Sequence, residues 1–388
     1  MRDLDRRNFL SIAAAALAAS SLRPVQALSP VAARRRLIIN ALGALDDPNP
    51  TPEQAQPTQS SPISDPQPRE FTSRVLQDAR ASGLSAVNLT LGYVAGSEEP
   101  FEYTVRDVAR MDVIVRRQSK DVLKVLTTAD ILRAQSEDRI GLIYGLQNAA
   151  MLGADASRVE IFANLGVRVI QLTYNPANAL GDGSAEPQNR GLTSFGREVV
   201  AHLNAQRVMV DLSHSGERTC LEAIRASAQP VSINHTGCRA LNDLPRNKTD
   251  DELRLVASRG GFVGIYFMPF LDRSGHATAE DVIAHVEHAL EVCGEDHVGI
   301  GTDGSTTAID DLNAYRAALA REVEARRAAG ISAAGEGPDT FPFVVDLRGP
   351  SQFHELAERL HRRGHSEARI DKILGQNFLR FAKDVWGS

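Results

Sequence analysis

The sequence predicts a single (β/α)₈ TIM barrel of the α/β class, and three observations support this fold. Eight short, β-branched apolar runs alternate with longer amphipathic stretches from residue 36 onward. Most of these runs end in polar residues, which suits a fold whose active site forms at the carboxyl ends of its strands. No Gly-rich GxGxxG turn follows the first run, and no Walker motif occurs, so an open doubly wound sheet is disfavoured.

The apolar runs have the length and character of parallel strands. Each is almost continuously apolar, as strands buried on both faces of a sheet should be. They occupy residues 37–42, 86–91, 140–146, 167–173, 208–212, 230–234, 262–267 and 298–301. The amphipathic stretches predict helices at 156–165, 193–206, 218–227, 250–259, 279–292, 352–363 and 366–386. Before the last two helices lies a long insertion at about 308–348, which contains residues 322–328.

The N-terminal residues 1–27 read as a targeting segment rather than as part of the fold. Arg6 and Arg7 precede an alanine-rich apolar stretch at 12–19, and Val25-Gln26-Ala27 is a small-x-Ala cleavage pattern. Paired arginines in this setting predict the twin-arginine export machinery as a partner and a periplasmic or secreted protein. The alternative is an N-terminal membrane anchor, but the apolar stretch is shorter than the roughly 18 residues that a span requires. The predicted barrel then occupies 28–388.

A Pro-rich segment at 47–70 follows the first predicted strand. Seven prolines among Ser, Thr and Gln remove backbone N–H donors, so neither a helix nor a central strand fits. We expect an extended surface loop here.

Charge and cysteine content exclude several function classes. The chain has 43 Lys and Arg against 49 Asp and Glu, for a net charge of −6, which gives no basic surface for nucleic acid. The three cysteines, Cys220, Cys238 and Cys293, lack CxxC spacing, so neither a disulfide framework nor a zinc–thiolate site is indicated. We expect three buried or partly buried thiols.

The strand ends carry the candidate site. His214 and His235 follow neighbouring predicted strands, and Asp303 ends the last one. Two neutral imidazoles suit Zn²⁺, and an aspartate across the mouth could act as ligand or proton acceptor. Each of these three residues could instead have a purely structural role, as a hydrogen-bonded residue at the end of a strand. Asp211 is equally compatible with a brace of the barrel and with a supporting role behind the ligands. Seven further histidines are predicted to lie on the surface: His276, His285, His288, His297, His354, His361 and His365.

At this point the sequence resembles the membrane (renal) dipeptidase family of metallopeptidases, family M19, among the amidohydrolase-like barrels. The resemblance extends from about Leu37 to Trp386 and rests on six segments in order. These are 191–196 (GLTSFG), 210–215 (VDLSHS), 233–236 (INHT), 246–251 (RNKTDD), 299–304 (GIGTDG) and 373–380 (ILGQNFLR).

The resemblance implies a metal-dependent-hydrolase-like barrel with a two-zinc centre that cleaves dipeptides. It assigns His214 and His235 to the second metal, Asp303 to the catalytic water and Arg246 to the substrate carboxylate. Tyr174 stands where the family has a substrate-contacting histidine, and it is a candidate substrate contact together with the adjacent Asn175.

The first metal site departs from the family pattern. Leu42-Gly43-Ala44 replaces the family's His-x-Asp, and Gln147 replaces the bridging Glu, so that Gln147 is at most a neutral ligand. Asp46 and Asp47 are alternative donors, although they lie beyond the strand end.

We therefore expect an exported dipeptidase-like hydrolase with about one zinc per chain, or two if unrecognised ligands exist. The expected substrate is a dipeptide or similar small amide. The alternative is a catalytically degenerate family member that binds a small molecule or peptide. The sequence leaves a homodimer open.

Overall fold

The computed structural model describes residues 35–49 and 70–387. By its internal contacts the chain divides into Met1–Arg35 and Arg36–Ser388, and the fold presented is that of the second unit. The predicted export signal at 1–27 and most of the Pro-rich loop lie outside the described residues. Within those residues, no helix has the length and apolar character needed to cross a membrane.

The strands form a parallel barrel, which confirms the predicted fold. In the described chain, hydrogen-bonded neighbours follow the order β1-β2-β4-β5-β6-β7-β8-β9. Backbone hydrogen bonds from Ala44 N to Gly304 O and from Asp303 N to Leu42 O join the first strand to the segment after the last. The strands are β1 (Ile39–Gly43), β2 (Ala86–Leu91), β3 (Val122–Lys124), β4 (Ile140–Leu146), β5 (Val167–Gln171), β6 (Met209–Asp211), β7 (Ser232–Thr236), β8 (Phe262–Ile265) and β9 (Val298–Ile300).

All eight predicted strands are present, and β3 is additional. It is a short strand that pairs with the beginning of β4, outside the barrel path. Three residues are too few for a periodic signal in the sequence, which is why the prediction missed it.

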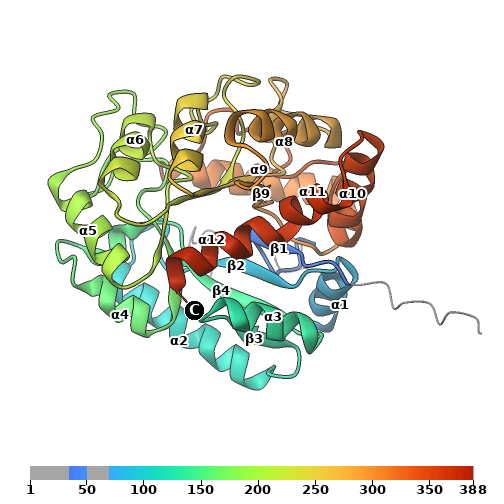
Figure 1. Ribbon diagram of the computed structural model, residues 1–388, viewed down its shortest axis with the longest axis horizontal. Coiled ribbons are helices and arrows are strands. Elements are labelled where there is room, and N and C mark those ends of the chain that lie inside the picture. Colours follow the sequence, from blue (N-terminus) through green and yellow to red (C-terminus); the bar gives the residue numbers. More distant parts are fainter. Residues whose placement is uncertain (1–34, 50–69, 388) are drawn as a thin grey trace, which may run out of the picture. The chain divides into compact units, whose positions relative to one another are not determined.

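Helices surround the strands, as Figure 1 shows for α1 to α8 and α10. Their starts follow local chemistry: Thr127, Thr249 and Thr278 each form a reciprocal capping box with an acidic residue three positions later. The α-helices up to the insertion are α1 (Ser73–Ala81), α2 (Pro100–Arg117), α3 (Thr128–Ser136), α4 (Arg158–Asn164), α5 (Ser194–Ala205), α6 (Glu217–Ala226), α7 (Asp250–Ser258) and α8 (Ala279–Cys293). Short 3₁₀ turns are η1 (Ala149–Leu152), η2 (Pro269–Leu271) and η3 (Gly349–Ser351).

The predicted insertion forms a separate small layer. It contains α9 (Leu312–Ala328), whose Leu319 and Val323 pack with Phe341 in a cluster of their own. The Asn175 side chain, which follows β5, donates to the backbone oxygen of Ile331 at 2.9 Å. This bond ties the insertion to the carboxyl end of the barrel.

The C-terminal run covers the opposite end. After α10 (Gln352–Arg362), the single helix predicted at 366–386 is observed as α11 (Glu367–Asp371), a π-helical turn η4 (Lys372–Gln376) and α12 (Asn377–Trp386). In the π-helical turn, a Cβ on Gly375 would lie 2.5 Å from Leu37 O, so the close approach to β1 requires glycine.

Helix α12 lies across the strands (Figure 1). Its buried face, including Phe378 and Phe381, shares an apolar cluster with Ile39, Val169 and Phe262 from the barrel interior. These residues begin or lie within their strands, so α12 fills the amino-terminal end of the barrel. The carboxyl end is the one available for a site.

Candidate functional site

The two predicted metal-binding histidines lie side by side at the carboxyl end of the barrel. His235 belongs to β7, and His214 lies in the loop that follows β6. Their Nε2 atoms are 2.9 Å apart, and both residues are buried. The structure thus brings the predicted pair together.

Hydrogen bonds fix the tautomer of His214. Asn175 donates through Nδ2 to Ile331 O, so its Oδ1 is an acceptor, and this Oδ1 lies 2.7 Å from His214 Nδ1. His214 Nδ1 therefore carries the proton and Nε2 presents its lone pair toward His235. The Nδ1 atom of His235 has no hydrogen-bond partner within the described residues.

Tyr174 and Asn175 both contact the His214 side chain directly. The Tyr174 ring stacks on the His214 ring, with centroids 4.3 Å apart and planes at 21°. Both polar atoms of the Asn175 amide are engaged, since Ser184 Oγ also donates to Oδ1. The prediction that these two residues contact substrate stays a prediction. Their observed contacts orient His214.

Asp211 braces the loop that carries His214. Its Oδ1 accepts hydrogen bonds from Ser213 N and Oγ and from Asn234 N, so it ties β6 to β7. Burial raises the pKa of this carboxyl, and the bonds from Ser213 oppose that rise. Of the two roles left open by the sequence, these contacts favour the brace.

Arg246 lies beside the histidine pair. It is 3% exposed, its Nη1 donates to Ser213 O, and its Nη2 lies 3.4 Å from His235 O and 3.3 Å from His214 Nε2. Burial, together with the Arg246 charge, holds the pKa of both histidines well below the usual value, so both imidazoles are neutral. Its predicted role in binding a substrate carboxylate stays a prediction.

The contacts of Arg246 predict a large effect on stability. Arg246→Met should remove charge-assisted hydrogen bonds and leave the carbonyls of Ser213 and His235 buried without donors, at a cost of about 2–4 kcal/mol. Urea unfolding measures this cost. The exposed Arg225, at the end of α6, provides a matched control, and equal midpoints for Arg246→Met and Arg225→Met would contradict the assignment.

Asp303 follows β9 and faces a cavity at the barrel mouth. Its backbone adopts φ +59°, a conformation that few residues other than glycine adopt. Burial raises the pKa of its carboxyl to about 6, although Arg246 and then Arg326 pull it down. A carboxylate with this pKa can accept a proton near neutral pH.

The cavity has a volume of about 530 Å³ and lies between the barrel mouth and the insertion. Ala44 and Asp303 line it from the strand ends, while α9 contributes one helix face with Tyr315, Glu322 and Arg326. The sequence analysis did not assign a role to these helix residues. Their spacing of seven and four positions, which places them on one face, is the signal that could have found them.

The donors present do not fit the two-metal centre that the resemblance implies. Leu42 and Ala44 offer no side-chain ligand, and Gln147 Nε2 donates to Thr90 Oγ1 at 2.6 Å. Asp46 reaches the mouth cavity, but no group of three or more His, Cys, Asp or Glu that could hold a metal occurs within residues 35–49 and 70–387. A catalytic zinc usually has three protein ligands. The histidine pair supplies two nitrogens for one ion.

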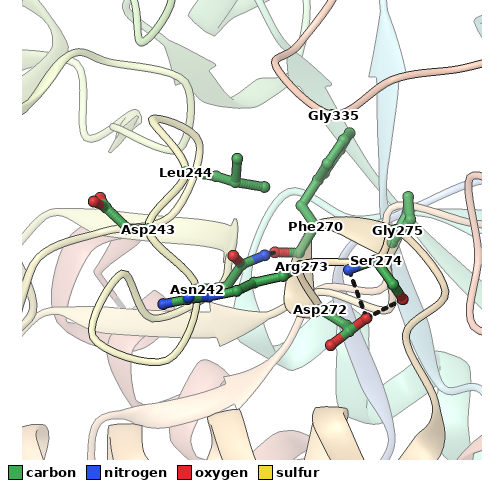
Figure 2. Close-up of a pocket in the computed structure, with 10 residues that line it drawn as sticks. Asn242, Asp243, Leu244, Phe270, Asp272, Arg273, Ser274, Gly275 and Gly335 are labelled. Carbon is green, nitrogen blue, oxygen red and sulfur yellow. Dashed lines mark hydrogen bonds between the residues drawn. The ribbon is translucent and has the colours of Figure 1, made fainter.

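A second cavity, of about 420 Å³, lies away from these residues. Figure 2 shows its lining: Asn242 to Leu244 after β7, Phe270 and Asp272 to Gly275 after β8, and Gly335 of the insertion. Asp272 accepts hydrogen bonds from Ser274 within this loop. None of the predicted site residues lines it.

The surface prediction for the remaining histidines is wrong for His285. This residue is 1% exposed; its Nδ1 accepts from Cys238 N at 2.8 Å, and its Nε2 contacts Leu271 O at 3.0 Å. It braces the loops after β7 and β8 from α8, because one imidazole can serve a donor and an acceptor at once. The prediction of three buried thiols is confirmed.

Comparisons with known proteins agree with the observed barrel fold and identify the family. A family model described as membrane dipeptidase, Peptidase family M19, matches residues 76–322. The dipeptidase tcpJ of Claviceps purpurea is 27% identical over 66% of this chain and 53% of its own length, so the chain spans about half of that relative.

Solved structures show the same fold. An amidohydrolase from Pseudomonas aeruginosa is 31% identical, with a TM-score of 0.73 over 91% of this chain and 97% of that one. A metallopeptidase from Rhodobacter sphaeroides, liganded with a phosphinate mimic of the dipeptide L-Ala-D-Ala, is 18% identical with a TM-score of 0.68 over 90% and 99% of the two chains.

Proposed function

Because the chain belongs to Peptidase family M19, the membrane dipeptidase family of hydrolases, we propose that it is an exported hydrolase that cleaves dipeptides or similar small amides with a depleted metal site. The observation that carries this proposal is the His214–His235 pair, whose Nε2 atoms lie 2.9 Å apart at the carboxyl end of the barrel. Asp303, at the end of the last strand, lines the cavity beneath the insertion, and the charges of Arg246 and Arg326 act on both Asp303 and His214. The predicted signal at residues 1–27 supports export through the twin-arginine machinery to the periplasm or outside the cell.

Each group has a defined chemical task in this proposal. Asn175 keeps the proton on His214 Nδ1, so the unprotonated Nε2 presents its lone pair and can serve as a metal ligand. His214 and His235 would hold one divalent ion, most simply Zn²⁺, which supplies polarisation of the scissile carbonyl. Asp303 accepts the proton of the attacking water on its carboxylate oxygen and passes it to the leaving amine. Breaking the C–N bond then releases two amino acids.

A binding protein without hydrolysis is the second candidate, and one observation favours it. The Arg246 guanidinium lies 3.3 Å from the same His214 Nε2 that would ligate the ion, and its positive charge opposes a cation there. In this case the cavity would hold a peptide or small molecule without cleaving it.

Metal analysis combined with a dipeptide panel distinguishes the two candidates. We expect about one divalent ion per chain in protein purified without chelator, and its loss in His214→Ala together with hydrolysis. His202→Ala, on α5 and away from the pair, is the matched control. Dipeptide binding without turnover in the wild type, at any metal content, would replace the hydrolase by the binding protein.

A further inference from the structure

We infer that Arg326, on the α9 face of the insertion, recognises the free carboxylate of the substrate, in place of Arg246 on the barrel. This inference rests on the proposed function, because it names the part of a small amide substrate that the same cavity selects. Arg326 lines the cavity at the barrel mouth together with Asp303. Arg246 is not part of that lining, and neither is the histidine pair beside it.

The contacts of Arg326 orient its guanidinium through Nε and Nη2 and leave Nη1 as the nitrogen that can donate to a ligand. Nε and Nη2 form a fork with the Glu336 carboxylate, with Nη2 to Oε1 at 2.8 Å and Nε to Oε2 at 3.1 Å. Nη2 also lies 3.3 Å from the Tyr174 hydroxyl. Within the described chain, Nη1 makes no hydrogen bond. A planar guanidinium held on one edge can still donate from this nitrogen to a carboxylate oxygen.

The position of Arg326 places that nitrogen near the reacting groups. Tyr174, its hydrogen-bond partner, stacks directly on His214. A substrate carboxylate at Arg326 would therefore lie about one side chain from the histidine pair, and a dipeptide has its scissile bond only a few atoms from its carboxylate.

The two arginines differ in what they can still bind. The Arg246 side chain is 3% exposed and donates to carbonyls beneath the pair, whereas the Arg326 side chain is 22% exposed. A substrate anion can reach Arg326 without displacing backbone contacts. The Glu336 carboxylate offsets part of the charge of Arg326, but it occupies only the Nε and Nη2 edge, so the Nη1 protons remain to donate to a carboxylate.

A pair of non-cleavable ligands tests the inference independently of hydrolysis. The probes are an alanyl-alanine analogue with CH₂–NH in place of the peptide bond, and the same analogue with a C-terminal carboxamide. We expect the wild type to bind the carboxylate form about 10- to 100-fold more tightly by calorimetry, the effect of one charge-assisted hydrogen bond. Arg326→Met should remove this preference, and Arg326→Lys should keep part of it.

Matched variants separate the outcomes. Arg327→Met, at the next and exposed position of the helix, should keep the preference. The inference is overturned if Arg326→Met and Arg326→Lys keep the full preference, or if Arg246→Lys alone removes it. Circular dichroism verifies that each variant folds. Selective binding by a wild type that cleaves no dipeptide would contradict the proposed hydrolase only, and cleavage with equal affinity for both probes would contradict the role of Arg326 only.

Discussion

Replacing Asp303 with asparagine is expected to lower dipeptide hydrolysis by at least about 100-fold, the usual contribution of a positioned general base. Asparagine has nearly the same shape but cannot accept a proton from water. The wild-type kcat/KM should rise with pH up to about 6 and then level off, because burial raises the pKa of Asp303 to about 6 and only the ionised form is a base. Initial rates between pH 5 and 8 measure both effects.

The same substitution should stabilise the fold at neutral pH. The folded-state pKa of Asp303 lies above its ordinary value of 3.8, so folding disfavours the charged form, and stability falls as pH rises from about 4 to about 6. Removing the charge should recover about 1–3 kcal/mol at pH 7, and nothing near pH 3 where the carboxyl is protonated in both states.

Opposite changes in activity and stability distinguish this role from a structural one. Urea unfolding of Asp303→Asn at pH 7 and pH 3 provides the comparison, with Asp339→Asn, at an exposed residue of the insertion, as control. A variant that loses activity and stability together at pH 7 would show that the carboxylate holds the strand end instead of serving as a base.

The barrel could be predicted from the sequence because each layer of the fold has a local signal. A parallel strand buried on both faces is an apolar run, as in β2 and β4, whose observed bounds match the predicted 86–91 and 140–146. The histidine pair could also be predicted, because the carboxyl ends of neighbouring parallel strands lie at the same edge of the sheet. His214 and His235 therefore had to lie close together once their strands were assigned as neighbours.

The insertion could not be read in the same way. Glu322 and Arg326 line the mouth cavity. The hydrogen bond that ties the insertion to the loop after β5, from Asn175 to Ile331, joins residues 156 positions apart. The buried position of His285 also depends on two partners, Cys238 and Leu271, that lie 47 and 14 residues away in the sequence. The spacing of Tyr315, Glu322 and Arg326 shows that they share a helix face, but no local pattern shows which part of the barrel that face meets.

The resemblance assigned Arg246 to the substrate carboxylate, a role that stays a prediction, but it could not give the surroundings of this residue. Its donors end on backbone carbonyls and on His214, and these contacts depend on how the loop after β7 folds back under the pair. The positive charge of this guanidinium would weaken the binding of a metal cation at His214. Variants that restore the missing metal ligands are therefore needed to show which of them limits metal binding.

Restoring the missing donors is expected to raise the metal content from about one to about two ions per chain. The change combines Leu42→His, Ala44→Asp and Gln147→Glu. Ala44 lines the mouth cavity, and Leu42 lies two residues earlier at the end of β1, on the same side of an extended chain. Gln147 follows β4, where a carboxylate would add the negative charge that two cations need.

Partial restorations separate charge from ligand number. Gln147→Glu alone should tighten the ion at the histidine pair without recruiting a second, since Leu42 and Ala44 still present no donor. The double variant Ala44→Asp with Gln147→Glu avoids placing an imidazole at the buried Leu42 site, which is 2% exposed. It should bind a second ion weakly. Metal analysis and dipeptide hydrolysis are measured for each variant alongside the wild type.

The triple variant should also hydrolyse dipeptides faster than the wild type, because a second ion adds charge stabilisation at the developing oxyanion. Arg246 sets a limit on this gain, since its guanidinium remains 3.3 Å from His214 Nε2 and continues to oppose an ion there. A triple variant with an unchanged circular dichroism spectrum that still binds one ion would mean that the side chains of residues 42 and 44 do not converge with residue 147. The match of β1 to the family's first strand would then be wrong.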